Sequence, residues 1–195
     1  MHGLINRAIE RFVRDTYGRD TWQQVMRRGA LDYNEFEAML TYDDHVTVDV
    51  LVAAQNVLDR PVADILEDIG TYLVSHPKVE ALRRLLRFGG STFTEFLHSL
   101  DDLPARARLA VSDLDLPQLE LREHAADSFS LICQSRHAGF GHVIVGLLRA
   151  LADDYGALVL LEHKGGGAGR EIIEIQLLSM VYASGRQFDL GARAE

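Results

Sequence analysis

The stretch that decides the fold is GGSTFTEFLHSLDDLP, residues 89–104. Phe93, Leu97 and Leu100 follow one another at steps of four and three, which places them on one face of a helix. Pro104 continues that face, but a proline lacks the amide donor and disfavours helical geometry in the residue before it. We therefore predict that the helix breaks or kinks between Asp101 and Pro104, where an aspartate can cap a new turn.

The sequence before this stretch has apolar residues at helical spacing. Pro61 and Pro77 stand where helices can begin, and Gly18 and Gly29 where helices can end. Helices are expected around Leu4–Val13, Trp22–Met26, Val46–Leu58 and Val62–Val74. A further helix is expected to be capped by Asn34 and to contain Phe36 and Leu40. Another is expected to begin at Pro77, with Leu82, Leu85 and Leu86 facing inward.

The sequence after this stretch changes to the pattern of strands, with alternating or β-branched residues. Strands are expected at Gln118–Arg122, Asp127–Ser135, Ala157–His163 and Glu171–Ser184, with one helix at Gly141–Tyr155. The glycine-rich segment 163–170 precedes a strand rather than a helix, so we interpret it as a turn and not as a phosphate-binding loop. The prediction is an α+β fold: a helical N-terminal half packed on a C-terminal four-stranded antiparallel sheet with one covering helix.

Composition limits the class of protein further. The chain has 195 residues, 47% of them hydrophobic, which suits one domain with a single sizeable core. We expect that domain to span residues 1–182, with 183–195 as a flexible tail. The formal charge of -9 disfavours binding to nucleic acid or to a membrane surface, and no apolar run is long enough to span a bilayer. A single cysteine, Cys133, is typical of a reducing cytoplasm.

No catalytic pattern stands out. The chain has eight histidines, but none belongs to an HExxH or cysteine–histidine zinc motif, and there is no G-x-S-x-G nucleophile elbow. Paired aspartates, as at 101–102 and 153–154, are interpreted as solvated helix ends. The sequence therefore favours a protein that is not an enzyme, and an unrecognised enzyme is the third of three hypotheses.

Several segments, in their order along the chain, resemble the heme nitric-oxide/oxygen-binding (H-NOX) family. They are MHGLINRAIERFVRDTYG, YDDHVTVDVLVAAQNVLDRPVADILEDIG, GGSTFTEFLHSLDDL followed by Pro117, and RHAGFGHVIVGLLRALADDYG. The resemblance covers residues 1 to 182. It implies a cytoplasmic sensory domain for nitric oxide that binds heme and regulates a signalling protein in trans, of the histidine kinase or diguanylate cyclase type. A homodimer is left open.

Both motifs that hold heme in the family are altered here. The position matching the proximal histidine, which ligates the iron, is Pro104, and proline has no ligand atom. The positions matching the Tyr-x-Ser-x-Arg that holds the heme propionates are Cys133, Ser135 and His137, so only the serine is kept. A propionate clamp needs a bidentate cation and a hydroxyl donor, which cysteine and neutral histidine supply poorly.

The remaining site positions carry two interpretations each. Ile5, Val74, Val143 and Leu147 resemble the lining of the family's distal gas pocket, or are core residues. Candidate replacement ligands for iron are Cys133, His137, His98 and His142, of which His98 falls on the polar side of its helix.

Two hypotheses lead. The first is a regulatory domain without normally ligated heme, whose pocket is filled by side chains or takes another apolar ligand. The second is a heme-binding gas sensor with non-standard axial ligation, held by burial of the macrocycle. We favour the first because Pro104 removes the ligand on which the family's switch depends.

Overall fold

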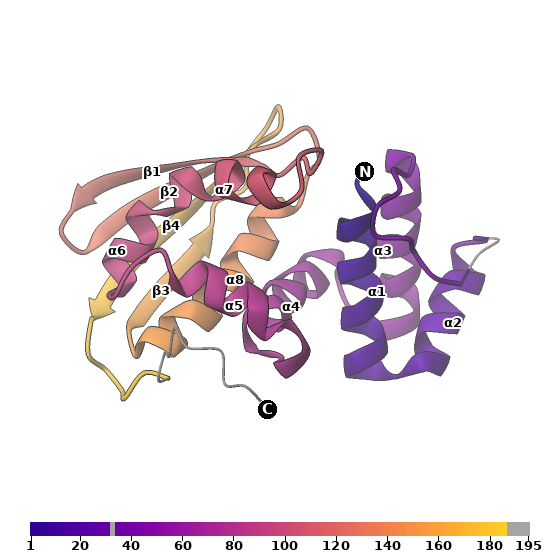
Figure 1. Cartoon of the computed structure of the whole chain (residues 1–195), viewed down its shortest axis with the longest axis horizontal. Helices are drawn as coiled ribbons and strands as arrows, with labels where there is room; N and C mark the ends of the chain where they lie inside the picture. Colours follow the sequence, from indigo (N-terminus) through magenta and orange to yellow (C-terminus); the bar gives the residue numbers. More distant parts are fainter. Residues whose placement is uncertain (32–33, 187–195) are drawn as a thin grey trace.

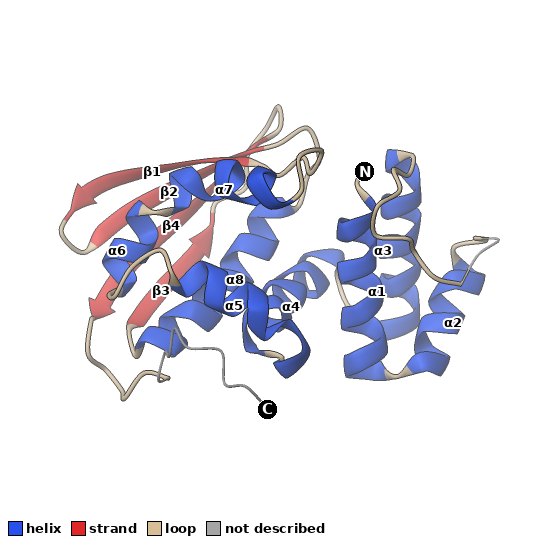
Figure 2. Ribbon diagram, viewed as in Figure 1, coloured by secondary structure: helices blue, strands red, loops and turns tan. Residues whose placement is uncertain are grey.

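A computed structural model describes residues 1–31 and 34–186 of the chain (Figure 1). Helices α1–α3 form an N-terminal lobe, and the sheet with its covering helices forms a C-terminal lobe beside it (Figure 2). This is the predicted α+β arrangement of a helical first half and an antiparallel sheet. None of the helices in the described ranges is long and apolar enough to cross a membrane.

The N-terminal helices agree with the predicted ones and extend slightly beyond them. They are α1 (Gly3–Tyr17), α2 (Arg19–Arg28), α3 (Asp44–Leu58) and α4 (Val62–Ser75). Gly18, with a φ of 94°, separates α1 from α2, and the imidazole of His2 accepts a hydrogen bond from the Leu4 amide to cap α1. Helix α4 begins directly after Pro61, which serves as its N-cap residue.

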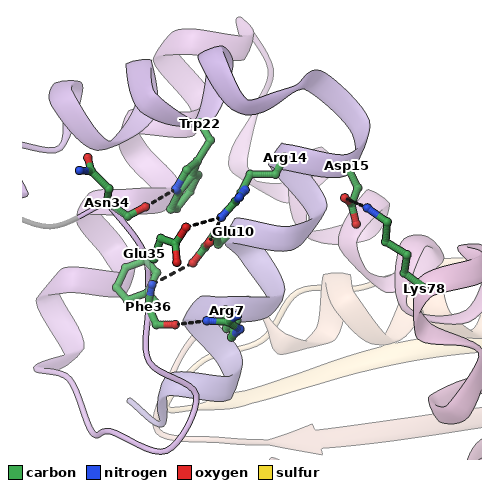
Figure 3. Close-up of polar contacts among 9 residues, drawn as sticks. All are labelled: Arg7, Glu10, Arg14, Asp15, Trp22, Asn34, Glu35, Phe36 and Lys78. Atoms are coloured by element: carbon green, nitrogen blue, oxygen red, sulfur yellow. Dashed lines mark hydrogen bonds and ion pairs between the residues drawn. The ribbon is translucent and has the colours of Figure 1, made fainter.

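The helix predicted from Asn34 through Leu40 is wrong, since the described residues 34–40 form bends and turns. The backbone of this segment is bound by side chains of α1 instead of by a helical ladder (Figure 3). The Phe36 amide donates to Glu10 Oε2 at 2.8 Å, and the Phe36 carbonyl accepts from Arg7 at 2.7 Å. The Phe36 side chain is fully buried, so this segment packs against the N-terminal core and covers part of it.

The predicted break before Pro104 is confirmed. Helix α6 (Phe93–His98) ends early, a 3₁₀ turn η2 (Leu100–Asp102) follows, and α7 (Leu103–Ala110) begins with Pro104 in its first turn. Asp102 occupies the N-cap position of α7 without a side-chain hydrogen bond, while Asp101 accepts from the Leu121 amide at 2.8 Å. Asp101 thus connects the turn η2 to strand β1 by a hydrogen bond, and the Asp102 side chain does not cap α7.

A 3₁₀ turn η1 (Pro77–Val79) and helix α5 (Glu80–Arg87) precede that region. Leu86 is buried as predicted, but Leu85 is 43% exposed because it lies on the outer side of the short α5. The following Gly89 and Gly90 lie so close to Ser99 and Glu95 that a Cβ at either position would collide with them. The glycine pair therefore allows α6 to fold back tightly against the chain.

The sheet has four antiparallel strands in the order β1-β2-β4-β3. Their bounds are β1 (Gln118–Ala125), β2 (Ser128–Gln134), β3 (Leu158–His163) and β4 (Arg170–Ser179). Strand β4 ends five residues earlier than the sequence suggested, because the chain leaves the sheet and Tyr182, Ala183 and Arg186 bond to the backbone of Gly156 and Asp154. Part of the predicted tail, residues 187–195, lies outside the described residues.

Helix α8 (Phe140–Tyr155) covers the inner face of the sheet and packs on α4. Gly70 of α4 and Gly146 of α8 bring the two helices into backbone contact, since a Cβ on either glycine would overlap the other helix. The buried apolar residues form two clusters, one in each lobe, and α4 contributes to both. The α4–α8 crossing is thus the packed joint between the lobes.

Candidate functional site

Pro104 is buried, as the helical face shared with Phe93, Leu97 and Leu100 predicts. Its ring lies in the first turn of α7, and its carbonyl accepts from Arg108 Nε at 3.3 Å. The position that the resemblance matches to the proximal ligand is therefore buried in this protein and has a side chain that cannot bind a metal.

Cys133 lies in β2 and is 1% exposed, inside the C-terminal core. Burial, with the nearby Glu171 carboxylate, raises the pKa of its thiol to about 12. A thiol that stays protonated at ordinary pH is a poor metal ligand and a poor nucleophile, because both roles require the thiolate. Cys133 therefore behaves as a core residue.

Strand β2 ends at Gln134, so Ser135 and His137 lie in the loop that leads to α8. The Ser135 hydroxyl accepts a hydrogen bond from the His137 amide at 3.1 Å, which shapes the loop. The His137 ring is turned toward the N-terminal lobe, with its Nε2 3.7 Å from Asp44 Oδ1. The positions that the resemblance matches to a clamp are thus separated: Cys133 faces the core and His137 faces Asp44 of α3.

Asp44 is the carboxylate that His137 meets. It also binds the amino group of Met1 at 2.6 Å, and this hydrogen bond, with smaller effects from His137 and Arg136, lowers the pKa of the Asp44 carboxyl. Arg136 donates to His137 Nε2 at 3.0 Å and pairs with Asp115 at 3.1 Å. Arg136 and His137 could bind a carboxylate of a ligand, but both side chains already contact carboxylates of the protein itself, those of Asp115 and Asp44.

A second histidine reaches across the lobes nearby. Nε2 of the buried His2 lies 3.5 Å from Asp113 Oδ1, in the segment between α7 and β1. Neither Asp44 nor Asp113 could be singled out from the sequence as a cross-lobe partner, because each stands among other acidic residues without a distinguishing pattern. His2 could have been noticed as a capping residue directly before α1.

The four positions that resemble a gas pocket lie along the boundary between the lobes. Val74 and Leu147 are buried in the C-terminal core, Val143 packs against the N-terminal core, and Ile5 is half-buried. They are distributed over α1, α4 and α8. Their present contacts are those of core packing.

The two histidines considered as replacement ligands have other partners. His98 is half exposed and its Nε2 lies 3.4 Å from Glu123 of β1, on the polar side as predicted. The His142 ring stacks on His163, with ring centroids 4.1 Å apart, and its Nδ1 lies 3.4 Å from Glu67. Across the described ranges no group of three or more His, Cys, Asp or Glu side chains is arranged to hold a metal ion.

Two surface hollows, each of about 390 Å³, lie away from the residue 104 region. One is lined by Asp115, Leu116, Gln118, Gln134, Ser135, Arg136 and Ala168, and the other by residues of β1–β4 including His124 and Ser130. Of the predicted site residues, only Ser135 contributes to either hollow. Neither is a buried apolar cavity suited to a porphyrin.

The residues present do not fit a heme held in the family's usual way. Pro104 offers no lone pair, position 133 has a thiol, which is a weak donor and is buried in the core, and the imidazole at 137 faces Asp44. Each of these disagrees with a separate requirement of the group: an axial ligand, a hydroxyl donor and a free cation.

The same fold is found in solved H-NOX proteins. Unliganded Fe(II) H-NOX from K. algicida superposes with a TM-score of 0.80 and 18% sequence identity, covering 94% of this chain and all of that one. The H-NOX protein from S. oneidensis in its Fe(II)NO state gives a TM-score of 0.76 at 17% identity, over 92% of this chain and 100% of that chain. These matches show that the chain has the fold of H-NOX proteins.

A sequence profile described as haem-NO-binding matches residues 2–163, most of the chain. The chain therefore belongs to the haem-NO-binding family, and as a sensor domain it is not itself catalytic. It is 25% identical to soluble guanylate cyclase gcy-31 of Caenorhabditis elegans over 79% of its own length, and 30% identical to guanylate cyclase soluble subunit beta-2 of Rattus norvegicus over 47%. It spans 22% and 13% of those two relatives, respectively.

Proposed function

We propose that this chain is a cytoplasmic H-NOX-like regulatory domain that acts on a signalling partner without normally ligated heme. The observation that carries the proposal is the buried Pro104, which occupies the proximal position. The contact between His137 and Asp44 supports it, because the loop that would clamp propionates binds the protein's own N-terminal lobe. A regulatory signal in such a domain comes from contact between proteins or from another apolar ligand.

The test is a hemin titration of purified protein followed by visible absorption. H-NOX from K. algicida, which shares the fold, serves as the positive control. We expect no sharp Soret band and no stoichiometric uptake, because hydrophobic burial alone gives neither a fixed ligand field nor one orientation. One equivalent of hemin bound with a sharp Soret band would overturn the proposal and favour a gas sensor with non-standard ligation.

Should hemin bind, His98→Ala, His142→Ala and His137→Ala separate the candidate ligands. Only removal of a true axial ligand shifts the Soret band, whereas removal of His98, which is half exposed, leaves the spectrum unchanged. A shift in any of the three identifies the ligand and rejects the heme-free interpretation.

The partner is proposed to be a histidine kinase or diguanylate cyclase acting in trans. The experiment adds the purified domain, without hemin, to a purified histidine kinase or diguanylate cyclase and measures autophosphorylation or cyclic dinucleotide synthesis. We expect a severalfold change in rate that saturates with the domain's concentration. An unchanged rate at saturating domain, with the domain folded by circular dichroism, would contradict this proposed partner class.

A further inference from the structure

The end of helix α8 contacts three other parts of the chain. Residues 154–156 form its last turn and its C-cap, where Gly156 has a φ of 75°. They contact helix α5, helix α6 and the segment 182–186, which follows β4. Parts of the chain that are far apart in the sequence therefore meet at the end of α8.

The segment 182–186, named here the C-terminal latch, is bound to α8 through its backbone. The Tyr182 amide donates to the Gly156 carbonyl at 2.8 Å, and two further amides of the latch donate to carbonyls of the same turn. Gly185 lies so near α8 that a Cβ on it would be 2.7 Å from the carbonyl carbon of Tyr155. Only a glycine allows this approach, because the backbone of α8 cannot move aside as a flexible side chain can.

Tyr155 connects the same turn of α8 to α6. Its ring packs against Phe93 and Phe96, with ring centroids 6.1 and 5.9 Å apart. Its hydroxyl donates to the Gly90 carbonyl at 2.8 Å, in the link that precedes α6. Because close-packed groups transmit displacements to their neighbours, a shift of α6 moves the surface on which the latch lies.

Helix α5 holds this turn of α8 in place from another side. Nε of the buried Arg83 lies 2.8 Å from Oδ1 of Asp154, whose side chain is 5% exposed. The Arg87 guanidinium lies over the Tyr155 ring, 3.7 Å from its centroid. A buried ion pair is costly to separate, so the turn stays attached to α5 while α6 and the latch can change position.

The chain from α6 to α7 consists of short pieces. Helix α6 has six residues, the 3₁₀ turn η2 has three, and α7 begins with Pro104 in its first turn. A 3₁₀ piece between helices often marks a hinge, and short pieces with few internal hydrogen bonds open at low free energy. These pieces therefore reposition more easily than α8, which has 16 residues.

We propose that the C-terminal latch is docked on α8 while α6 packs on Tyr155, and is released when that packing is lost. A change at α6 or at Pro104, which follows it, thereby reaches residues 182–186 through one tyrosine. This inference rests on the proposed regulatory function and supplies the element that carries its output. Coupling between two sites is reciprocal, so release of the latch also loosens α6.

Native-state hydrogen exchange of Gly185→Ala tests the coupling from the latch to α6. The added methyl group displaces the latch, and we expect the latch amides and those of Phe96 and Ser99 to exchange at least about fivefold faster, while β2 amides keep their rates. The control is Gly167→Ala, because a Cβ there meets no atom of the described chain within 4 Å. It leaves all these rates within about twofold.

Three results of this experiment would overturn the proposal. The first is a faster latch with unchanged amides in α6, which would mean that the two are not coupled. The second is an unchanged latch, which would mean that its docking does not need Gly185. The third is equal acceleration of β2, which would mean that the whole lobe opens.

Tyr155→Phe tests the coupling in the other direction with a milder change. It keeps the ring on Phe93 and Phe96 and removes only the hydroxyl that binds Gly90, so we expect latch amides to exchange about threefold faster. The control is Tyr182→Phe, since Tyr182 is 67% exposed, and it leaves the rates within about twofold. Equal rates in both variants would reject the route through Tyr155. Neither test involves heme or a partner, so failure here leaves the proposed function untouched.

Discussion

Glu10 is a charged side chain with 1% exposure, and its carboxylate holds two parts of the N-terminal lobe together (Figure 3). One oxygen accepts the Phe36 amide at 2.8 Å, and the other accepts Arg14 at 2.6 Å. The hydrogen bond from Arg14 raises the pKa of its guanidinium. Removing the carboxylate takes away the acceptor of a buried amide and the partner of a half-buried cation at once.

Glu10→Ala is therefore expected to lower the free energy of unfolding by about 2–3 kcal/mol. The control is Glu35→Ala, which removes the second carboxylate on Arg14 but is 60% exposed. That change costs less than about 0.5 kcal/mol, since an exposed ion pair contributes little. Urea denaturation of both variants measures the difference, and equal losses would contradict the role given to Glu10.

Asp15 gives the protein a pH dependence that can be assigned to one residue. Burial alone would raise the pKa of its carboxyl, but hydrogen bonds from Lys78 and Tyr72 outweigh this effect and lower that pKa below its ordinary value of 3.8. A group with a lowered native pKa stabilises the fold above its unfolded pKa, and this contribution is lost as pH falls through the native value.

Asp15→Asn should accordingly cost about 1 kcal/mol at pH 7, and its difference from the wild type should decrease as the pH falls from the ordinary pKa of 3.8 through the lowered native pKa. Unfolding free energies from pH 7 to pH 2 give the comparison. Asp49→Asn, in an exposed part of α3 with no ion pair, is the matched control and should run parallel to the wild type throughout. A constant gap between Asp15→Asn and wild type would rule out the linkage.

At the scale of elements, the crossing of α4 and α8 depends on two glycines. A Cβ at Gly146 would overlap the Glu67 carbonyl, and one at Gly70 would overlap the Val143 carbonyl. Backbone carbonyls cannot move aside as flexible side chains do, so the helices must separate to accept even one methyl group. The joint between the lobes is therefore sensitive to a very small change.

Gly146→Ala is expected to destabilise the protein by about 2–3 kcal/mol, although alanine favours helices over glycine. Gly29→Ala is the control, because a Cβ there meets only ordinary contacts at the end of α2. Chemical denaturation should show a small change or none for the control. A Gly146→Ala protein as stable as the wild type would mean that the helices separate without cost.

For the whole molecule, the two apolar clusters predict partly independent stability of the lobes. The lobes meet where α4 packs on α8 and at two polar contacts, His2 with Asp113 and His137 with Asp44. Native-state hydrogen exchange of Glu10→Ala should be faster in α1–α3 while the amides of β2 and β4 keep their rates. Equal acceleration in both lobes would show instead that the chain opens as one unit.

Much of the architecture could be predicted from sequence because it depends on local patterns. Apolar spacing located α1, α3, α4 and α8, strand alternation located the sheet, and Pro104 located the break after α6. The segment after Asn34 was misassigned because its backbone partners, Glu10 and Arg7, are distant in sequence. The strand at the C-terminus was drawn too long because apolar residues continue where the sheet does not.

By itself the sequence determined that residue 104 is a proline without a ligand atom, since this is a fact of side-chain chemistry. The match of Cys133, Ser135 and His137 to a propionate clamp stays a prediction from the resemblance. Only the tertiary structure decided where those side chains point. It placed the thiol in the core, turned the imidazole toward Asp44 and bound residues 182–186 to the end of α8. Such outcomes depend on contacts between residues far apart in the chain, and no local pattern encodes them.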